Sequence, residues 1–201
     1  MTDPLGEELA GTESNRLPDS QSGSRLTGWR KELSALARTA VVAAAVVLIL
    51  NKFVVNLSIV EGSSMRPTLV EGDWLLVSRL AGSVLPVERN DVVIIRDPEP
   101  LSGSTGYLVK RIIGLPGDTV ELKEGNLVRN GLQVVEPYAY HIAEEESFRA
   151  VTVEPGHLFV LGDNRQRRAS RDSRAFGTID ESAVTGRAEL VLWPMQRLGW
   201  L

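Results

Sequence analysis

The sequence predicts a mainly β domain, built from antiparallel sheets or a partly closed barrel, preceded by one N-terminal transmembrane helix. Three observations lead to this prediction. Short runs of valine, isoleucine, leucine and aromatic residues recur after residue 57, separated by turn residues. Two of the intervening turns have the sequences of tight reversals. A single uncharged apolar stretch near residue 45 stands apart from the rest of the chain.

Composition divides the 201 residues into three parts. Residues 1–38 begin with a sequence rich in Ser, Gly, Glu, Asp and Pro, and we expect them to form a disordered tail. Residues 39–56 hold the apolar stretch, and residues 57–201 form the β-rich domain. A hydrophobic content of 43% is enough to bury a core, while the net charge of -4 gives no reason to expect a nucleic-acid partner.

The apolar stretch is predicted to be a membrane anchor. It contains thirteen uncharged residues, 39–51, bounded by Arg38 and Lys52. Thirteen helical residues span only about 20 Å of a hydrocarbon core about 30 Å thick. However, both cations have long stems that can reach the interface, and residues 53–55 extend the apolar character. A buried core helix would show a polar face and a cleaved leader would end in a small-x-small site, and neither feature is present.

Cations are concentrated before this stretch. Arg25, Arg30, Lys31 and Arg38 precede it, whereas only Lys52 lies close behind. By the positive-inside rule, the N-terminal tail is then cytoplasmic and the residues after about 57 lie outside. We therefore expect a single-pass membrane protein, with the lipid bilayer as a partner and an extracytoplasmic domain.

The β-rich part contains recognisable strands and turns. Leu115-Pro116-Gly117-Asp118 has Pro and Gly at the central positions of a type II turn. Asn130-Gly131 is a strong two-residue hairpin signal between two apolar runs. With few helical patterns among them, the segments favour antiparallel pairing. The predicted strands are residues 73–78, 91–95, 107–113, 119–122, 127–129, 132–135 and 157–161.

A serine and a lysine are the candidate catalytic pair. Ser64 lies within the run Gly62–Leu69, and Lys110 follows it 46 residues later in an apolar strand. The chain has no cysteine, which excludes disulfides, thiolate zinc sites and a cysteine nucleophile. Its two histidines, His141 and His157, stand in no motif-like setting, so a Ser-His-Asp arrangement is poorly supported.

Lysine acts as a base at working pH only where desolvation makes its neutral amine accessible. The alternation of a strand places Leu108, Lys110 and Ile112 on one face of the segment 107–113. The amine therefore lies between two large apolar neighbours. Taken alone, however, Ser64 is typical of a turn or helix cap, and a strand lysine is usually solvated.

Four stretches in order resemble the type I signal peptidases, and with the apolar stretch the resemblance covers about residues 39–201. The stretches are Gly62 to Leu69, similar to the serine box; Gly72 to Arg79, similar to the strand that follows; Lys110-Arg-Ile-Ile-Gly-Leu-Pro-Gly-Asp118, similar to the lysine box; and Gly162-Asp-Asn-Arg165 with Ser170-Arg-Asp-Ser-Arg174, similar to the last box.

The resemblance implies a serine endopeptidase of the bacterial cell membrane that removes signal peptides from exported preproteins, cutting after small residues of the Ala-x-Ala type. By match to the boxes, Ser64 is the nucleophile, Lys110 is the general base, and the backbone N–H of Ser64 helps hold the oxyanion. Ser170 matches the serine that orients the lysine amine, while Asp172 and Arg174 match the pair that braces this region. The resemblance implies no metal or organic cofactor.

The chain departs from some members of that family at two places. Gly62 stands where some members carry a serine whose hydroxyl joins the oxyanion hole, so a second donor must come from elsewhere. Residues 166–169 separate the two halves of the last box, where two residues are more usual. We expect an extended substrate along the strand edge near residues 58–62. The candidate walls of its pockets are Val60, Leu108 and Val109.

Other classes can be tested on the same residues. Penicillin-binding proteins and class A β-lactamases need Ser-x-x-Lys, but Pro67 stands there; α/β-hydrolases need Gly-x-Ser-x-Gly, but Arg66 breaks that motif. A self-cleaving repressor would need a DNA-binding domain in place of the tail and apolar stretch. A membrane-anchored, catalytically silent interaction domain on the same fold is the remaining alternative, and a cleavage assay distinguishes it.

Overall fold

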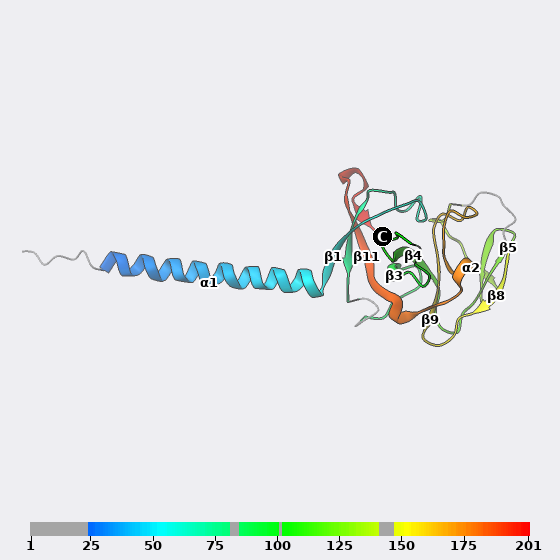
Figure 1. The fold of residues 1–201 in the computed structure, drawn as a ribbon, viewed down its shortest axis with the longest axis horizontal. Coiled ribbons are helices and arrows are strands. Elements are labelled where there is room, and N and C mark those ends of the chain that lie inside the picture. Colours follow the sequence, from blue (N-terminus) through cyan, green and yellow to red (C-terminus); the bar gives the residue numbers. More distant parts are fainter. Residues whose placement is uncertain (1–23, 81–84, 101, 141–146) are drawn as a thin grey trace, which may run out of the picture. The chain divides into compact units, whose positions relative to one another are not determined.

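The computed structural model describes residues 24–80, 85–100, 102–140 and 147–201. The chain divides after Val46 into two compact units. The first unit contains most of a long helix, and the second contains two antiparallel sheets (Figure 1).

Helix α1 (Ser24–Phe53) is 30 residues long. Residues 24–38, which we expected to belong to a disordered tail, are part of this helix, while residues 1–23 lie outside the described part. The physical reason lies in the sequence: helix-forming Arg, Lys, Glu and Ala surround leucine and tryptophan residues at helical spacing. These apolar residues are Leu26, Trp29, Leu33 and Leu36.

Among the described residues, no helix is both long enough and apolar enough to cross a membrane. The anchor predicted over residues 39–56 is therefore not confirmed. Its C-terminal limit also differs from the prediction, because α1 ends at Phe53 and strand β1 (Val55–Ile59) begins two residues later. The β-branched Val55 and its neighbours pair with another strand, as described next, instead of extending the helix.

The larger sheet has eight strands, and every neighbouring pair is antiparallel. Its path runs from β1 to β10 without closing on itself. In spatial order the strands are β1, β2 (Trp74–Ser78), β11 (Val184–Trp193), β3 (Val92–Arg96), β4 (Tyr107–Gly114), β9 (His157–Leu161) and β10 (Ile179–Asp180), with β12 (Gly199–Trp200) paired to β11. The prediction of a mainly β, antiparallel domain is thus confirmed.

The smaller sheet has four strands in the order β7 (Leu132–Gln133), β6 (Asn126–Arg129), β5 (Thr119–Lys123) and β8 (Phe148–Thr152). Its β6–β7 hairpin turns at Asn130 and Gly131, which both have positive φ as the predicted turn requires. The predicted turn before β5 is also present, because Asp118 donates its backbone N–H to the Leu115 carbonyl at 2.9 Å. Three short helices complete the domain: α2 (Ser173–Phe176), η1 (Glu181–Ala183) and η2 (Met195–Arg197).

Strand β4 lies where three clusters of buried apolar side chains meet. Leu108 and Ile112 pack in the first cluster, Val109 packs against the second, and Ile113 belongs to the third. This division confirms the predicted alternation of faces and places Lys110 between two apolar neighbours. Strand β3 supports the same region, since Val93 is the register partner of Lys110.

Candidate active site

Ser64 lies in a turn between β1 and β2 that is anchored in the core by its flanking residues. Met65 is 2% exposed and Leu69 is fully buried, and the Leu69 N–H donates to the Met65 carbonyl at 2.9 Å. The Ser64 side chain is half-buried and lines a cleft. Within the described part of the chain, no hydrogen bond occupies the backbone N–H of Ser64.

Lys110 meets Ser64 from strand β4. Its Nζ lies 3.0 Å from Ser64 Oγ and 2.8 Å from the Val109 carbonyl oxygen. Although it is a lysine, it is only 2% exposed. The two residues that the sequence singled out are therefore brought within hydrogen-bonding distance.

Burial is the main influence on the Lys110 amine. Desolvation lowers the pKa of Lys110 from its ordinary value of 10.5 to about 8. The negative charges of Asp172 and Asp163 oppose this shift, while the positive charge of Arg174 adds to it. The amine therefore has a larger neutral fraction near neutral pH than an ordinary lysine, as a lysine base requires.

The backbone of the serine turn is held by the 162–165 turn that follows β9. The Asn164 N–H donates to the Ser64 carbonyl at 3.0 Å, and its side-chain amide donates to the Ser63 carbonyl at 3.1 Å. Gly162 permits this close approach, since a Cβ atom at that position would collide with the Ser64 carbonyl oxygen and the Ser170 hydroxyl.

Asp172 and Arg174 form the predicted pair, in which Asp172 is buried and the Arg174 side chain is 11% exposed. Asp172 caps α2, accepts the Gly162 N–H at 3.0 Å, and accepts two side-chain bonds from Arg174 at 2.9 Å. Burial, the largest influence, acts to raise the pKa of Asp172, but Arg174 and the Gly162 N–H outweigh it and lower that pKa below its ordinary value. Asp172 is therefore a fixed negative charge that favours the protonated form of Lys110.

Ser170 lies beside these groups but does not make the expected bond to the amine. Its hydroxyl is buried and has no hydrogen-bond partner in the described part of the chain. It lies near enough to Asp172 to favour the charged carboxylate, although without normal hydrogen-bond geometry. The predicted orienting contact with Lys110 is therefore absent from this structure.

A cleft of about 560 Å³ opens beside Ser64 and Lys110. The three residues predicted to form pocket walls line it, namely Val60, Leu108 and Val109. Gly62 also lines it, with a φ of +82° that side-chain-bearing residues rarely adopt. Serine at this position would therefore be strained as well as polar. His157 begins β9, where its Nδ1 lies 3.2 Å from the Pro155 carbonyl; His141 lies outside the described residues.

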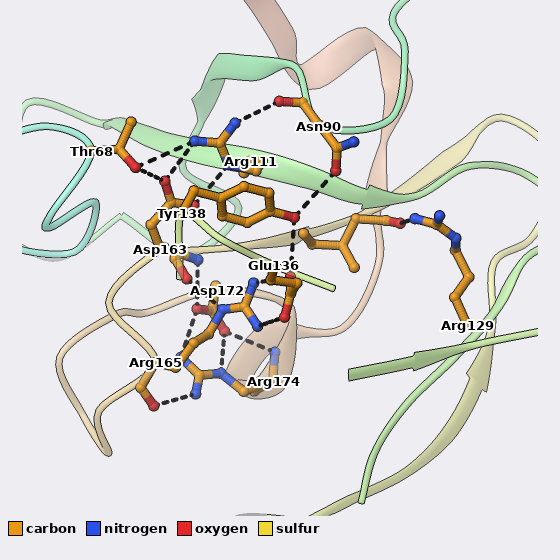
Figure 2. A network of polar contacts seen from close by, with 12 residues as sticks. Thr68, Asn90, Arg111, Arg129, Glu136, Tyr138, Asp163, Arg165, Asp172 and Arg174 are labelled. Atoms are coloured by element: carbon orange, nitrogen blue, oxygen red, sulfur yellow. Dashed lines mark hydrogen bonds and ion pairs between the residues drawn. The ribbon is translucent and has the colours of Figure 1, made fainter. Parts of the chain in front are cut away.

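A buried network of polar side chains surrounds the 162–165 turn (Figure 2). Arg111 donates two bonds to Asp163, at 2.8 and 2.6 Å, and Thr68 donates a 2.5 Å bond to the same carboxylate. Arg165 forms a two-bond ion pair with Glu136. Sequence reasoning missed Glu136, because no local pattern links it to an arginine 29 residues away; its only signal was an acidic residue just after a hairpin.

Comparisons with known proteins add to this geometry. The family model described as signal peptidase, peptidase S26, matches residues 33–193. The chain is similar to a signal peptidase I of Bacillus licheniformis, with 36% identity over 182 residues that cover 86% of this chain and 95% of that protein. It is also similar to a signal peptidase IB of Staphylococcus aureus strain Mu50, with 32% identity over 182 residues, covering 82% and 92%. A crystal structure of a signal peptidase I from Enterococcus faecalis V583 matches with a TM-score of 0.43 and 33% identity, covering 52% of this chain and 98% of that one.

Proposed function

Because this chain belongs to the signal peptidase family, peptidase S26, we propose that it is a serine endopeptidase that removes signal peptides from exported preproteins, with Ser64 as nucleophile and Lys110 as general base. One observation carries the assignment of residues: a buried lysine amine lies 3.0 Å from a serine hydroxyl at the edge of a cleft. This distance is within the range for direct proton transfer.

The proposed reaction begins with the neutral Lys110 amine, which takes the proton from Ser64 Oγ as that oxygen attacks the scissile carbonyl. The Ser64 backbone N–H, which no described group occupies, is available to donate to the developing oxyanion. The protonated amine then gives its proton to the leaving amine. Water attacks the resulting acyl-enzyme while Lys110 accepts its proton, and Lys110 then returns this proton to Ser64 Oγ as the ester bond breaks, which regenerates the free serine and the neutral amine.

The cleft supports an extended substrate with small side chains. Its lining combines the segment 58–62 with residues of β4, so a peptide lying there passes directly over Ser64. Val60, Leu108 and Val109 are the proposed walls of shallow apolar pockets, and such walls favour cleavage after an Ala-x-Ala sequence.

The decisive experiment incubates the purified full chain with a preprotein and locates the cut by mass spectrometry. We expect one cut at an Ala-x-Ala site by the wild-type protein, and less than about 1% of that rate for Ser64→Ala, Lys110→Arg and Lys110→Met. Arginine keeps the charge but cannot supply a base, and methionine keeps much of the apolar stem. His157→Ala is the matched control and should retain full activity. A wild-type protein that cuts nothing would instead favour a silent interaction domain.

The proposed place of action is the cell membrane, with residues 57–201 on its outer side. Support comes from the excess of cations before residue 39 and from exposed apolar side chains along α1, among them Val41, Val42 and Val47. Carbonate extraction of membranes tests the attachment, and protease added to spheroplasts tests the orientation. We expect the chain to stay with the membranes and the domain to be digested while the tail survives. Recovery in the soluble fraction would reject the attachment, and a digested tail with an intact domain would reject the orientation.

A further inference from the structure

The segment 136–140 contacts the 162–165 turn. It follows β7 of the smaller sheet, yet it pairs with the turn beyond β9: the Tyr140 N–H donates to the Asp163 carbonyl at 2.8 Å, and the Arg165 N–H donates to the Tyr140 carbonyl at 3.2 Å. This turn is the one whose Asn164 N–H binds the Ser64 carbonyl. The segment therefore contacts the support of the nucleophile without lining the cleft.

Glu136 makes the strongest contact of this segment. Its carboxylate accepts two bonds from Arg165, at 2.6 and 2.5 Å, and the two side chains are only 1% and 5% exposed. The same guanidinium donates through Nε to the Gly162 carbonyl at 2.9 Å. Because three donors of one rigid, planar group are engaged, Glu136 fixes where Arg165 holds the backbone of Gly162.

Tyr138 contacts both this ion pair and a second one, formed by Arg111 and Asp163. Its hydroxyl donates to Glu136 at 3.1 Å or to Asn90 at 3.2 Å, and its ring lies 4.0 Å below the Arg111 guanidinium (Figure 2). Arg111 in turn holds Asp163 of the same turn. The turn is thus held by Arg111 at Asp163 and by Arg165 at Gly162, and Tyr138 lies between these two contacts.

We propose that Glu136 is a positioning residue for the nucleophile, acting through Arg165 and the 162–165 turn to fix the Ser64 backbone relative to the Lys110 amine. The inference rests on the proposed function of Ser64 and Lys110. It assigns Glu136 no contact with the substrate, so its loss reduces the rate of the chemical step and leaves substrate binding intact. A shift of about 1 Å in such a constellation lowers the rate by about 10²-fold.

Glu136→Gln tests the proposal, because it keeps the shape of the side chain and removes the charge that holds Arg165. In the preprotein assay we expect kcat to fall about 10-fold to 100-fold, with KM within about 3-fold of wild type. The pH limb of kcat should keep its wild-type midpoint, since Glu136 is not among the groups that shift the pKa of Lys110. Tyr138→Phe, which removes only one hydroxyl, should lower kcat by about 2-fold to 5-fold.

The double variant Glu136→Leu/Arg165→Met separates positioning from stability. It removes both charges, leaves no unpaired buried ion, and should regain much of the urea midpoint lost by Glu136→Gln. It also removes the donor to the Gly162 carbonyl, so kcat should remain low. Recovery of kcat along with the urea midpoint, or wild-type kcat in a folded Glu136→Gln protein, would overturn the proposal.

Arg89→Gln is the matched control, because it breaks an ion pair with the buried Asp118 in the turn before β5, outside the cleft lining. It should lower the urea midpoint and leave kcat unchanged. An inactive wild-type enzyme would reject the proposed function itself. An active wild type with active Glu136 variants would reject only the role of Glu136.

Discussion

Opposing influences set the pKa of the Lys110 amine. Desolvation lowers its pKa to about 8, whereas the buried carboxylate of Asp172 favours the protonated form. Removing the solvent from around a cation is the larger effect here, because the Asp172 charge is already shared with Arg174. The pKa of Lys110, the proposed base, is therefore adjusted in part by residues that do not contact Ser64.

This balance predicts the pH dependence of cleavage. The rate should rise with pH along a limb with a midpoint near 8, because only the unprotonated amine accepts the serine proton. Arg174→Gln removes a positive charge that lowers the pKa of Lys110, so the limb should shift to higher pH. Initial rates measured from pH 6 to 10 on folded proteins check both statements. A flat profile across this range would contradict the assignment of the base.

Gly162 should tolerate no side chain, because a methyl group there meets the Ser64 carbonyl oxygen and Ser170. We expect Gly162→Ala to lower kcat by about 100-fold or more and stability by about 1–3 kcal/mol. Gly156→Ala is the matched control: its φ of +77° makes alanine unfavourable, but nothing lies within 4 Å of the added carbon. It should lose about 1–2 kcal/mol and keep its kcat. Urea denaturation and steady-state kinetics measure the two effects, and equal kcat losses in both variants would count against a local collision.

Among the elements, the connection between β3 and β4 forms one wall of the cleft through Gly103, Ser104 and Thr105. Arg171, from the last of the four boxes, holds this connection in place. It forms an ion pair with the buried Asp97 and donates to the Glu99 carbonyl at 2.5 Å. The Asp97 N–H donates to the Gly106 carbonyl at 2.9 Å, which closes the base of the connection.

Weakening the contacts that hold this wall should change KM, through substrate binding, more than kcat. We expect Arg171→Gln to raise KM by about 5-fold to 10-fold and to leave the pH midpoint of kcat in place, because Arg171 is not among the groups that shift the pKa of Lys110. Arg167→Gln, at an exposed position four residues earlier, is the matched control. Kinetics on a signal-peptide substrate give both parameters. Unchanged KM in Arg171→Gln would show that the wall needs no such support.

The strands show which sequence patterns were informative. β4 was predicted because its alternation is regular and its ends are marked by turn residues. β11 was missed: Gly186, Arg187 and Glu189 interrupt the apolar run, and its pairing contains irregularities beside Ala188 and Val191. Strand β1 was not predicted as a strand, because its first residues continue the apolar stretch before them and were assigned to the anchor.

The features of the site also differ in whether the sequence could predict them. The contact between Ser64 and Lys110 was predictable because each residue lies in a local sequence box, and the apolar flanks of Lys110 were visible in the strand alternation. The bond expected from Ser170 depended on side-chain direction after a four-residue spacer, which sequence spacing does not specify. Glu136 depends on a contact between segments 29 residues apart, and only the folded chain reveals it.

For the whole molecule, the buried amine is a source of instability. Below pH 8 both folded and unfolded chains carry the Lys110 proton, so folding buries a charge. Between about 8 and 10.5 only the unfolded chain holds the proton, and the free energy of unfolding therefore rises with pH. A pKa difference of about 2.5 units corresponds to roughly 3 kcal/mol.

Lys110→Met should accordingly be more stable than wild type at pH 7. After the loss of two hydrogen bonds is subtracted, we expect a gain of about 1–2 kcal/mol. The gain should shrink toward pH 10, where the wild-type penalty disappears. Urea unfolding of both proteins at pH 7 and pH 10 measures the difference. A variant that is less stable than wild type at pH 7 would show that Lys110 is buried as a well-compensated cation.

Strand β11 lies between β2, which follows Ser64, and β3, which pairs with the strand of Lys110. Among the described strands, β2 and β3 are joined only through β11, which begins at Val184. During synthesis, the ribosome must therefore release residues 184–193 before this sheet connects the two sides of the cleft. A nascent chain that stops before residue 184 lacks the joining strand, so we expect it to cleave nothing, even though Ser64 and Lys110 have already been made.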